Sequence, residues 1–435
     1  MKSLCAAICG SFGILFLLTA CDLKSNKEHS FLLDKELVDT ALKNQIENNN
    51  LPGASALIYI DGKEAYFGAF GMADRESREP MSRETLVQIF SMTKPVTGVA
   101  LMTLYEEGKF DLNAPLEKYA PEFANLMVYA GENDDGEIIL EEPERLPTIY
   151  DVLRHTAGFS SNHAGDNPVN KILKSVDPLS RENTLAEMAE KLGSVPLLSQ
   201  PGSRWLYGPS VDVQAFLVER LSGMAFDDYV QEKILTPLKM HNTQYVLNAD
   251  KLERMAALYN RQEDGSFTRE PDESSYSYYT KDWPMKYGGW GLTSNLDDYM
   301  RFARMLVNGG ELDGIRILKP ETVALMATDA MPDTVTDISW LSNKGQVGFG
   351  VDFAVRTASP ASAEEASGEV GEFFWDGAAN TLFWVDPVNK LTAVLFTQYK
   401  PFGRVPLHKA FRDAVYANDE TASSLLLNNA KATAQ

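Results

Sequence analysis

Strand-like segments lie near both ends of this 435-residue chain, with mainly helical sequence between them. Near the N-terminus, residues 55–60 and 64–70 are rich in apolar, β-branched and aromatic side chains, and Asp61-Gly62-Lys63 is a hairpin signal. Three further strands are expected near the C-terminus, at residues 348–353, 381–385 and 391–397. The pattern predicts one sheet built from both ends of the chain.

Helices are predicted on both sides of these strands and between them. Their approximate ranges are 34–48, 91–107, 148–155, 211–223, 295–308 and 407–416. The fold class expected is therefore α+β, an antiparallel sheet flanked by helices, with an inserted helical lobe over about residues 115–285. The acidic stretch 131–144 is expected to be a solvated loop. A cleft between two lobes is a usual place for a small-molecule site.

One tetrapeptide, Ser91-Met92-Thr93-Lys94, lies at the predicted start of a helix. Residues three apart share one face of a helix, so the Ser91 hydroxyl and the Lys94 amine would be neighbours. A serine needs an adjacent base to become a nucleophile, and a lysine in an apolar pocket can lose its proton and serve as that base. The spacing indicates nucleophilic catalysis by Ser91.

Charge and composition exclude several classes of function. The formal net charge of −21 repels nucleic acid, so no nucleic-acid partner is expected. The five histidines have no metal-binding spacing, and the chain contains no phosphate-binding glycine loop. Neither a metal nor a cofactor is therefore expected.

The N-terminus has the pattern of an export signal. Lys2 precedes an apolar run at residues 12–18, and Leu18-Thr19-Ala20-Cys21 resembles a bacterial lipoprotein cleavage box. We therefore expect a lipoprotein signal peptide over residues 1–20 and lipidation of Cys21, which would hold an exported protein on a membrane, facing the periplasm or the cell surface. Three further segments are expected, namely a tether at 21–32, the folded domain at 33–417 and a disordered tail at 418–435.

Several motifs, in order, resemble those of the class C β-lactamase and penicillin-binding-protein family of serine hydrolases, over roughly residues 35–415. They are Leu51-Pro52-Gly53-Ala54-Ser55, the Ser91–Lys94 tetrapeptide, Leu153-Arg154-His155-Thr156-Ala157-Gly158, Pro237-Leu238-Lys239-Met240 and Gly288-Gly289-Trp290-Gly291-Leu292. The resemblance implies the β-lactamase/transpeptidase-like fold.

The family's second catalytic motif, Tyr-x-Asn, matches Tyr207-Gly208-Pro209 here. By this resemblance, Tyr207 relays a proton between Ser91 and the leaving group, with a pKa lowered by the Lys94 ammonium. Pro209 replaces the asparagine whose amide helps to bind a substrate's acyl amide.

The third family motif, Lys-Thr-Gly, matches Trp375-Asp376-Gly377. The resemblance implies a substrate-binding role for these three residues, and an oxyanion hole formed by the backbone N–H groups of Ser91 and Ala378. Trp375 replaces the lysine that holds a substrate carboxylate, and a Trp-x-Gly sequence is similar to the esterase branch of the family. Gly377 is expected to let the strand approach the substrate closely.

The function expected is hydrolysis of small carboxylic esters through an acyl-enzyme on Ser91, with a small ester or amide as the only molecular partner besides the membrane. Alternatives are a β-lactamase, a D-alanyl carboxypeptidase or D-amino-acid peptidase, and a non-catalytic penicillin-binding-like lipoprotein. The sequence leaves the oligomeric state open.

Other residues give weaker signals. Gly208-Pro209-Ser210-Val211-Asp212 falls one residue short of an α/β-hydrolase nucleophile elbow, and Ser210 is expected to be a helix N-cap instead. His155 is expected to make a structural hydrogen bond. A cluster of aromatic residues could line the cleft or simply pack; its members are Tyr276, Tyr278, Tyr279, Trp283 and Tyr287.

The lipoprotein hypothesis predicts that Cys21→Ser leaves unprocessed precursor or blocks lipidation, because the thiol is the acylated group. Metabolic labelling with a palmitate analogue, followed by membrane fractionation, measures both effects. A wild-type protein that takes up no label would contradict the hypothesis.

Overall fold

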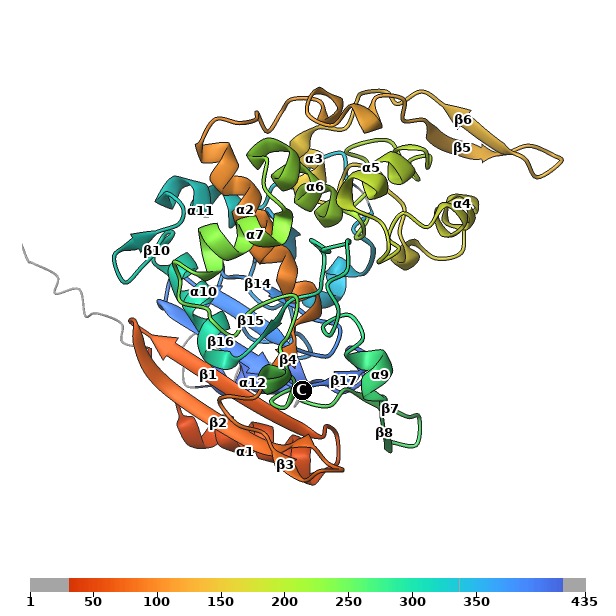
Figure 1. The fold of residues 1–435 in the computed structure, drawn as a ribbon. Coiled ribbons are helices and arrows are strands. Elements are labelled where there is room, and N and C mark those ends of the chain that lie inside the picture. The colour runs from red at the N-terminus through yellow and green to blue at the C-terminus, as the bar shows by residue number, and fades with distance from the viewer. Residues whose placement is uncertain (1–30, 336, 418–435) are drawn as a thin grey trace, which may run out of the picture. The chain divides into compact units, whose positions relative to one another are not determined.

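The computed structural model describes residues 31–335 and 337–417, and its central element is an eight-stranded antiparallel sheet (Figure 1). In sheet order the strands are β12 (Val347–Phe349), β13 (Ala354–Arg356), β14 (Phe373–Asp376), β15 (Leu382–Asp386), β16 (Leu391–Phe396), β1 (Gly53–Ile60), β2 (Lys63–Asp74) and β3 (Glu79–Pro80). Strands β1 and β16 pair directly, which joins the two ends of the described chain as predicted.

The β1–β2 hairpin follows from its turn and its apolar alternation. Asp61 and Gly62 both have positive φ, 50° and 73°, as a two-residue turn between twisted strands requires. Leu57 faces Phe67 on β2 and Val394 on β16 in the register. Strand β1 is buried over its first six residues, so it forms the middle of the sheet core.

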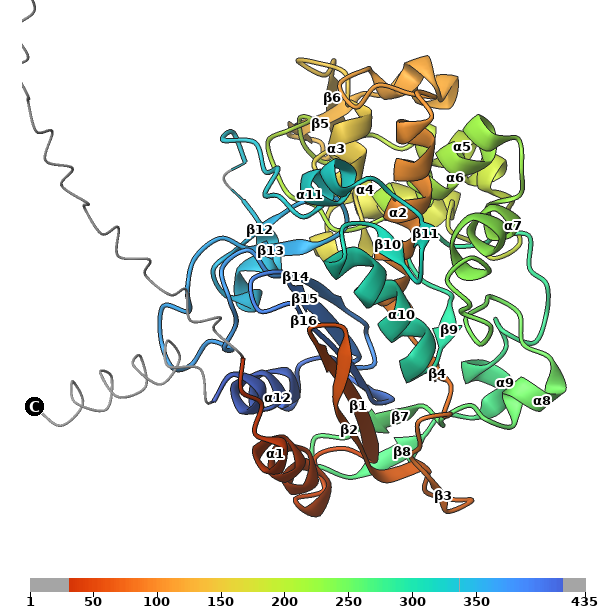
Figure 2. The ribbon, with the colours of Figure 1, turned by 90° about the vertical axis from the view of Figure 1, so that its left-hand side faces the viewer.

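Helices cover both faces of the sheet (Figure 2). Helix α10 (Leu296–Val307) packs against β16, β15 and β1, while α1 (Lys35–Glu47) and α12 (Leu407–Tyr416) pack together, with α1 against β2. Two of these helices have side-chain N-caps: Asp34 and Asn295 accept backbone N–H groups at the starts of α1 and α10.

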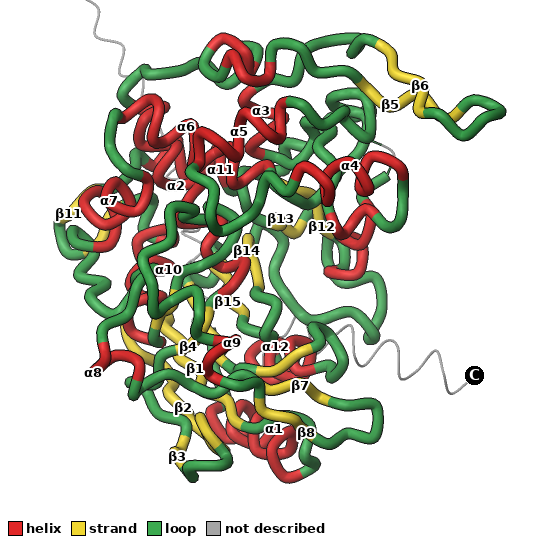
Figure 3. Tube along the Cα trace, turned by 45° about the vertical axis from the view of Figure 1, so that its right-hand side comes forward, coloured by secondary structure: helices red, strands yellow, loops and turns green. Residues whose placement is uncertain are grey.

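Helix α2 (Thr93–Glu106) is buried along most of its length and packs against α6 (Ser210–Ser222) and α7 (Phe226–Val230). Figure 3 shows helices α3 to α6 gathered beyond one end of the large sheet. The remaining α-helices are α3 (Ile149–Leu153), α4 (Pro168–Val176), α5 (Leu185–Gly193), α8 (Ala249–Leu252), α9 (Asp272–Ser275) and α11 (Pro320–Met326). Within residues 31–335 and 337–417, none of the helices is long and apolar enough to cross a bilayer.

Short helical turns and small sheets complete the described chain. The turns are η1 (Phe90–Met92), η2 (Leu116–Lys118), η3 (Pro121–Phe123), η4 (Asn162–Ala164), η5 (Gln231–Leu235) and η6 (Ser339–Lys344). The small sheets pair β4 (Val87–Gln88) with β9 (Thr293–Ser294), β5 (Val128–Glu132) with β6 (Ile138–Glu141), β10 (Glu311–Leu312) with β11 (Ile315–Arg316), and β8 (Phe267–Arg269) and β17 (Tyr399–Lys400) with β7 (Tyr259–Arg261).

Two predicted segments differ in the structure. Residues 348–353 do not form one strand, because β12 ends at Phe349 and the chain turns back into β13. Asp352 in this turn has φ of +58°, a conformation that aspartate tolerates better than most residues. The acidic stretch at 131–144 contributes to the β5–β6 hairpin rather than forming only a loop, although its carboxylates remain mostly exposed.

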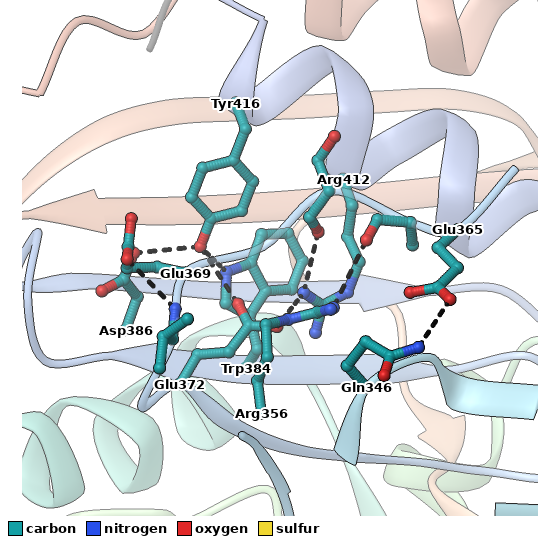
Figure 4. Close-up of polar contacts among 12 residues, drawn as sticks. Gln346, Arg356, Glu365, Glu369, Glu372, Trp384, Asp386, Arg412 and Tyr416 are labelled. Carbon is teal, nitrogen blue, oxygen red and sulfur yellow. Dashed lines mark hydrogen bonds and ion pairs between the residues drawn. The ribbon is translucent and has the colours of Figure 1, made fainter. Parts of the chain in front are cut away.

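A buried ionic network fastens α12 to the sheet (Figure 4). The Glu372 carboxylate accepts hydrogen bonds from Arg356 at 2.8 Å and from Arg412 at 2.7 Å, and the Tyr416 hydroxyl lies 3.2 Å from it. The Arg412 guanidinium also lies over the Trp384 ring at 4.5 Å. Because an unpaired charge is costly to bury, these partners fix the position of α12 beside the C-terminal strands.

Candidate active site

The predicted nucleophile lies in a tight turn between β4 and α2. Ser91 is the central residue of η1, directly before the first turn of α2, and its side chain is partly accessible. The preceding residue, Phe90, has φ of +45°, which is strained for a bulky side chain. Strain of this kind persists only where the surrounding structure imposes it, and it is concentrated at functional sites.

Lys94 lies one helical turn from Ser91, as the spacing predicts. Its Nζ is 3.2 Å from Ser91 Oγ and 2.6 Å from the carbonyl oxygen of Gly289. Only 5% of Lys94 is exposed. The serine hydroxyl and the lysine amine are therefore within hydrogen-bonding distance in a site largely closed to water.

The segment 288–292 holds α2 in this position. The Thr97 hydroxyl donates to the Gly288 carbonyl at 2.8 Å, and the Leu292 N–H donates to Thr93 Oγ1 at 3.2 Å. A Cβ at Gly288 would lie 2.2 Å from the Val211 carbonyl oxygen on α6, so only glycine allows this approach. The motif at residues 288–292 thus positions Lys94 of the Ser91–Lys94 motif.

Burial lowers the pKa of Lys94 to about 8, although three nearby carboxylates, Asp212, Asp352 and Asp376, oppose this shift. The same burial raises the pKa of Asp212 to about 6 and that of Asp352 well above its usual value. Desolvation is thus the dominant effect on Lys94. Near pH 8 about half of the amines are neutral and able to accept the Ser91 proton.

Tyr207 lies beside this pair, in the loop before α6. The Lys94 Nζ is 4.5 Å from the centre of its ring, and the indole N–H of Trp375 donates to its hydroxyl at 3.2 Å. Burial raises the pKa of Tyr207 above its usual value, outweighing the opposing hydrogen bonds with Ser91 and Trp375. The expectation that Lys94 lowers the pKa of Tyr207 is therefore wrong. Tyr207 is a neutral phenol, which can both accept and donate a hydrogen bond.

Aromatic rings surround Tyr207 and cause this burial. Their centres lie 5.0 to 5.7 Å from the Tyr207 ring, and they belong to His155, His163, Trp205, Trp340 and Trp375. His155 was expected to form a hydrogen bond, but neither of its ring nitrogens has a hydrogen-bond partner in the described part of the chain, and Nε2 lies 3.9 Å from Asp352 Oδ1. Burial also lowers its pKa well below the usual value, so His155 packs here as a neutral ring.

Strand β14 closes the other side of the site. The Trp375 side chain extends toward Tyr207, and the exposed Ala378 follows the strand. A Cβ at Gly377 would lie 2.4 Å from the carbonyl oxygen of Ile89, so this glycine lets the strand approach the backbone just before Ser91. An oxyanion hole at the N–H groups of Ser91 and Ala378 stays a prediction.

A family model described as Beta-lactamase matches residues 38–417 of the chain.

The chain belongs to the Beta-lactamase family.

Two relatives and one solved structure extend this result. Esterase EstB of Burkholderia gladioli is 30% identical over 397 residues, covering 87% of this chain and 94% of its own. Monacolin J acid methylbutanoyltransferase of Aspergillus terreus is 26% identical over 412 residues, covering 88% and 95%. Simvastatin synthase from Aspergillus terreus superposes with a TM-score of 0.76, with 22% identity and coverage of 88% and 98%, which shows the fold. This family contains serine hydrolases and acyltransferases, and the predicted α+β, β-lactamase-like fold is confirmed.

Several residues of this candidate site were missed from the sequence. Asp212 and Asp352 lie near Lys94, Trp340 packs on Tyr207, and Lys344 forms an ion pair with Asp376. The spacing of Asp212, five residues after Tyr207 and in the first turn of α6, could have suggested it. The others come from the loop after α11 and from the β12–β13 turn, which carry no motif.

The alternative nucleophile does not fit this fold. Ser210 is buried as the first residue of α6, with Pro209 at the N-cap position, so Ser210 is not the N-cap that the sequence suggested. The strands of the large sheet pair antiparallel throughout, unlike the mainly parallel sheet of an α/β-hydrolase.

The aromatic cluster at 276–287 packs behind segment 288–292. Tyr278 and Tyr287 donate their hydroxyls to the carbonyls of Met285 and Leu179, at 2.8 and 2.7 Å. Tyr287 also stacks on Trp290, with 4.4 Å between ring centres. Packing is therefore the role that the structure gives this cluster.

We expect a fluorophosphonate probe to label Ser91, because its hydroxyl lies 3.2 Å from the buried amine of Lys94. Mass spectrometry of the labelled peptide locates the adduct. Ser91→Ala should abolish labelling without changing the circular dichroism spectrum, and Ser210→Ala is the matched control that should keep it. An adduct on Ser210 would overturn the assignment.

Lys94→Arg should slow labelling of Ser91 by about 10²-fold or more, nearly as much as Lys94→Ala, because arginine keeps its proton. In the wild type the labelling rate should rise with pH and level off above about pH 8, since only the neutral amine is a base. Stopped-time labelling between pH 6 and 9.5 measures this profile. Near-normal labelling of Lys94→Arg would show that the lysine acts only through its charge.

Proposed function

We propose that this protein hydrolyses small, neutral carboxylic esters through an acyl-enzyme on Ser91. The observation that carries the proposal is the position of Trp375. Its indole N–H donates to the Tyr207 hydroxyl, and it lies where the Lys-Thr-Gly motif of the family has its lysine. The name and similarity of esterase EstB support the same chemistry. Trp375 is 1% exposed, so its effect is to leave this position without a cation for a charged acyl or alcohol group.

The first half-reaction forms the acyl-enzyme. Ser91 Oγ attacks the ester carbonyl carbon while its proton passes to the neutral Lys94 amine. Negative charge collects on the carbonyl oxygen, which the N–H groups of Ser91 and Ala378 would stabilise. As the C–O bond to the alcohol breaks, the Tyr207 phenol gives the alcohol a proton and recovers one from the Lys94 ammonium.

The second half-reaction is the reverse, with water in place of the alcohol. Water attacks the acyl carbon, its proton returns through Tyr207 and Lys94, and Ser91 leaves with its proton restored. An alcohol could replace water as acceptor, and the similarity to a methylbutanoyltransferase favours this as the second candidate function. Both reactions use the same acyl-enzyme, so they differ only in what enters the site.

Membrane attachment through a lipid on Cys21, with the domain in the periplasm or on the cell surface, is part of the same proposal. Cys21, the signal peptide at 1–20, most of the tether at 21–32 and the tail at 418–435 lie outside the described residues. The support is the sequence pattern of the N-terminus.

Neutral esters should be much better substrates than β-lactams or D-alanyl peptides. Pro209 offers no amide for an acyl-amide side chain, and Trp375 offers no cation for a carboxylate. A charge-assisted bond contributes about 1.5–3 kcal/mol, which corresponds to roughly tenfold to over a hundredfold in binding. The measurement is kcat/KM for p-nitrophenyl butyrate against nitrocefin.

The Ser91→Ala variant is the control for uncatalysed hydrolysis in both assays. A ratio below one would replace the proposal by β-lactamase activity, and the absence of turnover on both substrates would favour a binding protein. Product analysis in the presence of butanol distinguishes hydrolysis, which gives butyrate, from transfer, which gives butyl butyrate.

A further inference from the structure

Beside the candidate catalytic residues, an ion pair joins Asp376 of the third motif to Lys344, which lies outside the motifs. Lys344, the last residue of η6, bonds to the carboxylate of Asp376, the last residue of β14. The two side chains are 8% and 10% exposed, so the pair is largely withdrawn from water. An ion pair in such a place interacts strongly because little solvent screens it.

Aromatic rings hold the Lys344 amine next to the site. Its Nζ lies 4.9 Å from the centre of the Trp375 ring, 5.2 Å from Trp340 and 5.1 Å from Phe402. Trp375 and Trp340 are also the rings that contact Tyr207. Only one layer of rings therefore separates this cation from the catalytic phenol.

The pair also borders a cavity of about 620 Å³, which Trp340, Phe402, Asn380 and His408 line as well. Asp376 lies two residues before Ala378, the predicted oxyanion-hole residue, and so links the cavity to the candidate site, although Ser91, Lys94 and Tyr207 are not among the residues that line it. A volume of this size can take a substrate's acyl or alcohol group.

Lys344 thus places a cation close to Trp375, although Trp375 itself replaces the lysine that the third motif led us to expect. The Asp376 carboxylate already pairs with that cation. A substrate carboxylate that entered the cavity would have to displace Asp376 or lie beside it, and both cost free energy. A neutral group meets no such barrier.

We infer that the Lys344–Asp376 pair is a specificity element, through which Asp376 masks the Lys344 cation and excludes carboxylate-bearing esters from a site that would otherwise bind them. The inference rests on the proposed esterase function and names its substrate class more narrowly. It assigns Lys344 and Asp376 to selection between substrates, not to bond cleavage.

The test uses two pairs of esters, each differing by one carboxylate. Mono-p-nitrophenyl adipate is compared with p-nitrophenyl hexanoate, and 4-butyryloxybenzoate with its methyl ester, so that the charge lies on the acyl or on the alcohol side. For each variant, kcat/KM of the carboxylate ester is divided by that of its neutral partner. The wild type should favour the neutral partner in both pairs.

Asp376→Asn should raise this ratio by about tenfold or more in at least one pair, because Lys344 is then free to bind the carboxylate. The double variant Lys344→Met/Asp376→Asn should lose the gain. Lys344→Gln, which leaves Asp376 unopposed, should lower the ratio below that of the wild type. Asp74→Asn is the matched control, since it removes the same charge from an ion pair with Arg269 on β8 and should leave the ratio unchanged.

The outcomes separate this inference from the proposed function. If the wild type hydrolyses the neutral esters but neither Asp376→Asn nor Lys344→Gln changes a ratio more than Asp74→Asn does, the inference is overturned. A gain in Asp376→Asn that survives in the double variant would also overturn it, because the cation would not be its source. No turnover of neutral esters by the wild type would reject the esterase function itself. If Asp376→Asn does not fold, the fall expected in Lys344→Gln decides.

Discussion

The burial of one amine governs the chemistry of this site. Lys94 is enclosed by α2, α6 and segment 288–292, and this desolvation lowers its pKa to about 8 despite three carboxylates nearby. Without it, the Asp212, Asp352 and Asp376 charges would keep the amine protonated and unable to accept the Ser91 proton. The packing of Gly288 on Val211 and the bond from Thr97 to Gly288 help to hold this enclosure together, and the enclosure lowers the pKa of Lys94.

The same burial raises the pKa of Tyr207, whereas it lowers that of Lys94. Burial disfavours the charged form of either group, so it removes a proton from the lysine and keeps one on the tyrosine. A neutral amine beside a neutral phenol can pass a proton in both directions without creating a lasting charge separation. The Trp375 indole N–H donates to the phenol oxygen, which occupies one acceptor position of the hydroxyl and helps to fix the ring.

The features that could be predicted from the sequence are those formed by residues close together in the chain. The Ser91–Lys94 contact follows from residues three apart on a helix, and the hairpin of β1 and β2 follows from Asp61-Gly62. The Lys344–Asp376 pair joins residues 32 apart, one of them in the short helical turn η6, which carries no motif, so periodicity gives no sign of it. The predicted direction of the Tyr207 pKa shift was wrong for a similar reason, because the rings that bury Tyr207 come from separate parts of the chain.

Burial of the Lys94 amine lowers the free energy of unfolding. The amine has a pKa of about 8 in the folded chain against 10.5 in water, so below pH 8 folding buries an ammonium at a cost of about 3 kcal/mol. The cost diminishes as the pH rises from 8 to 10.5, where the unfolded chain holds the proton more tightly than the folded one. Core burial elsewhere must offset this cost, since only Cys5, Cys9 and Cys21 could form disulfides and all three precede residue 31. The central sheet, with β1 and β16 buried in its middle, supplies that burial and carries the strand that positions Trp375 and Asp376 beside the amine.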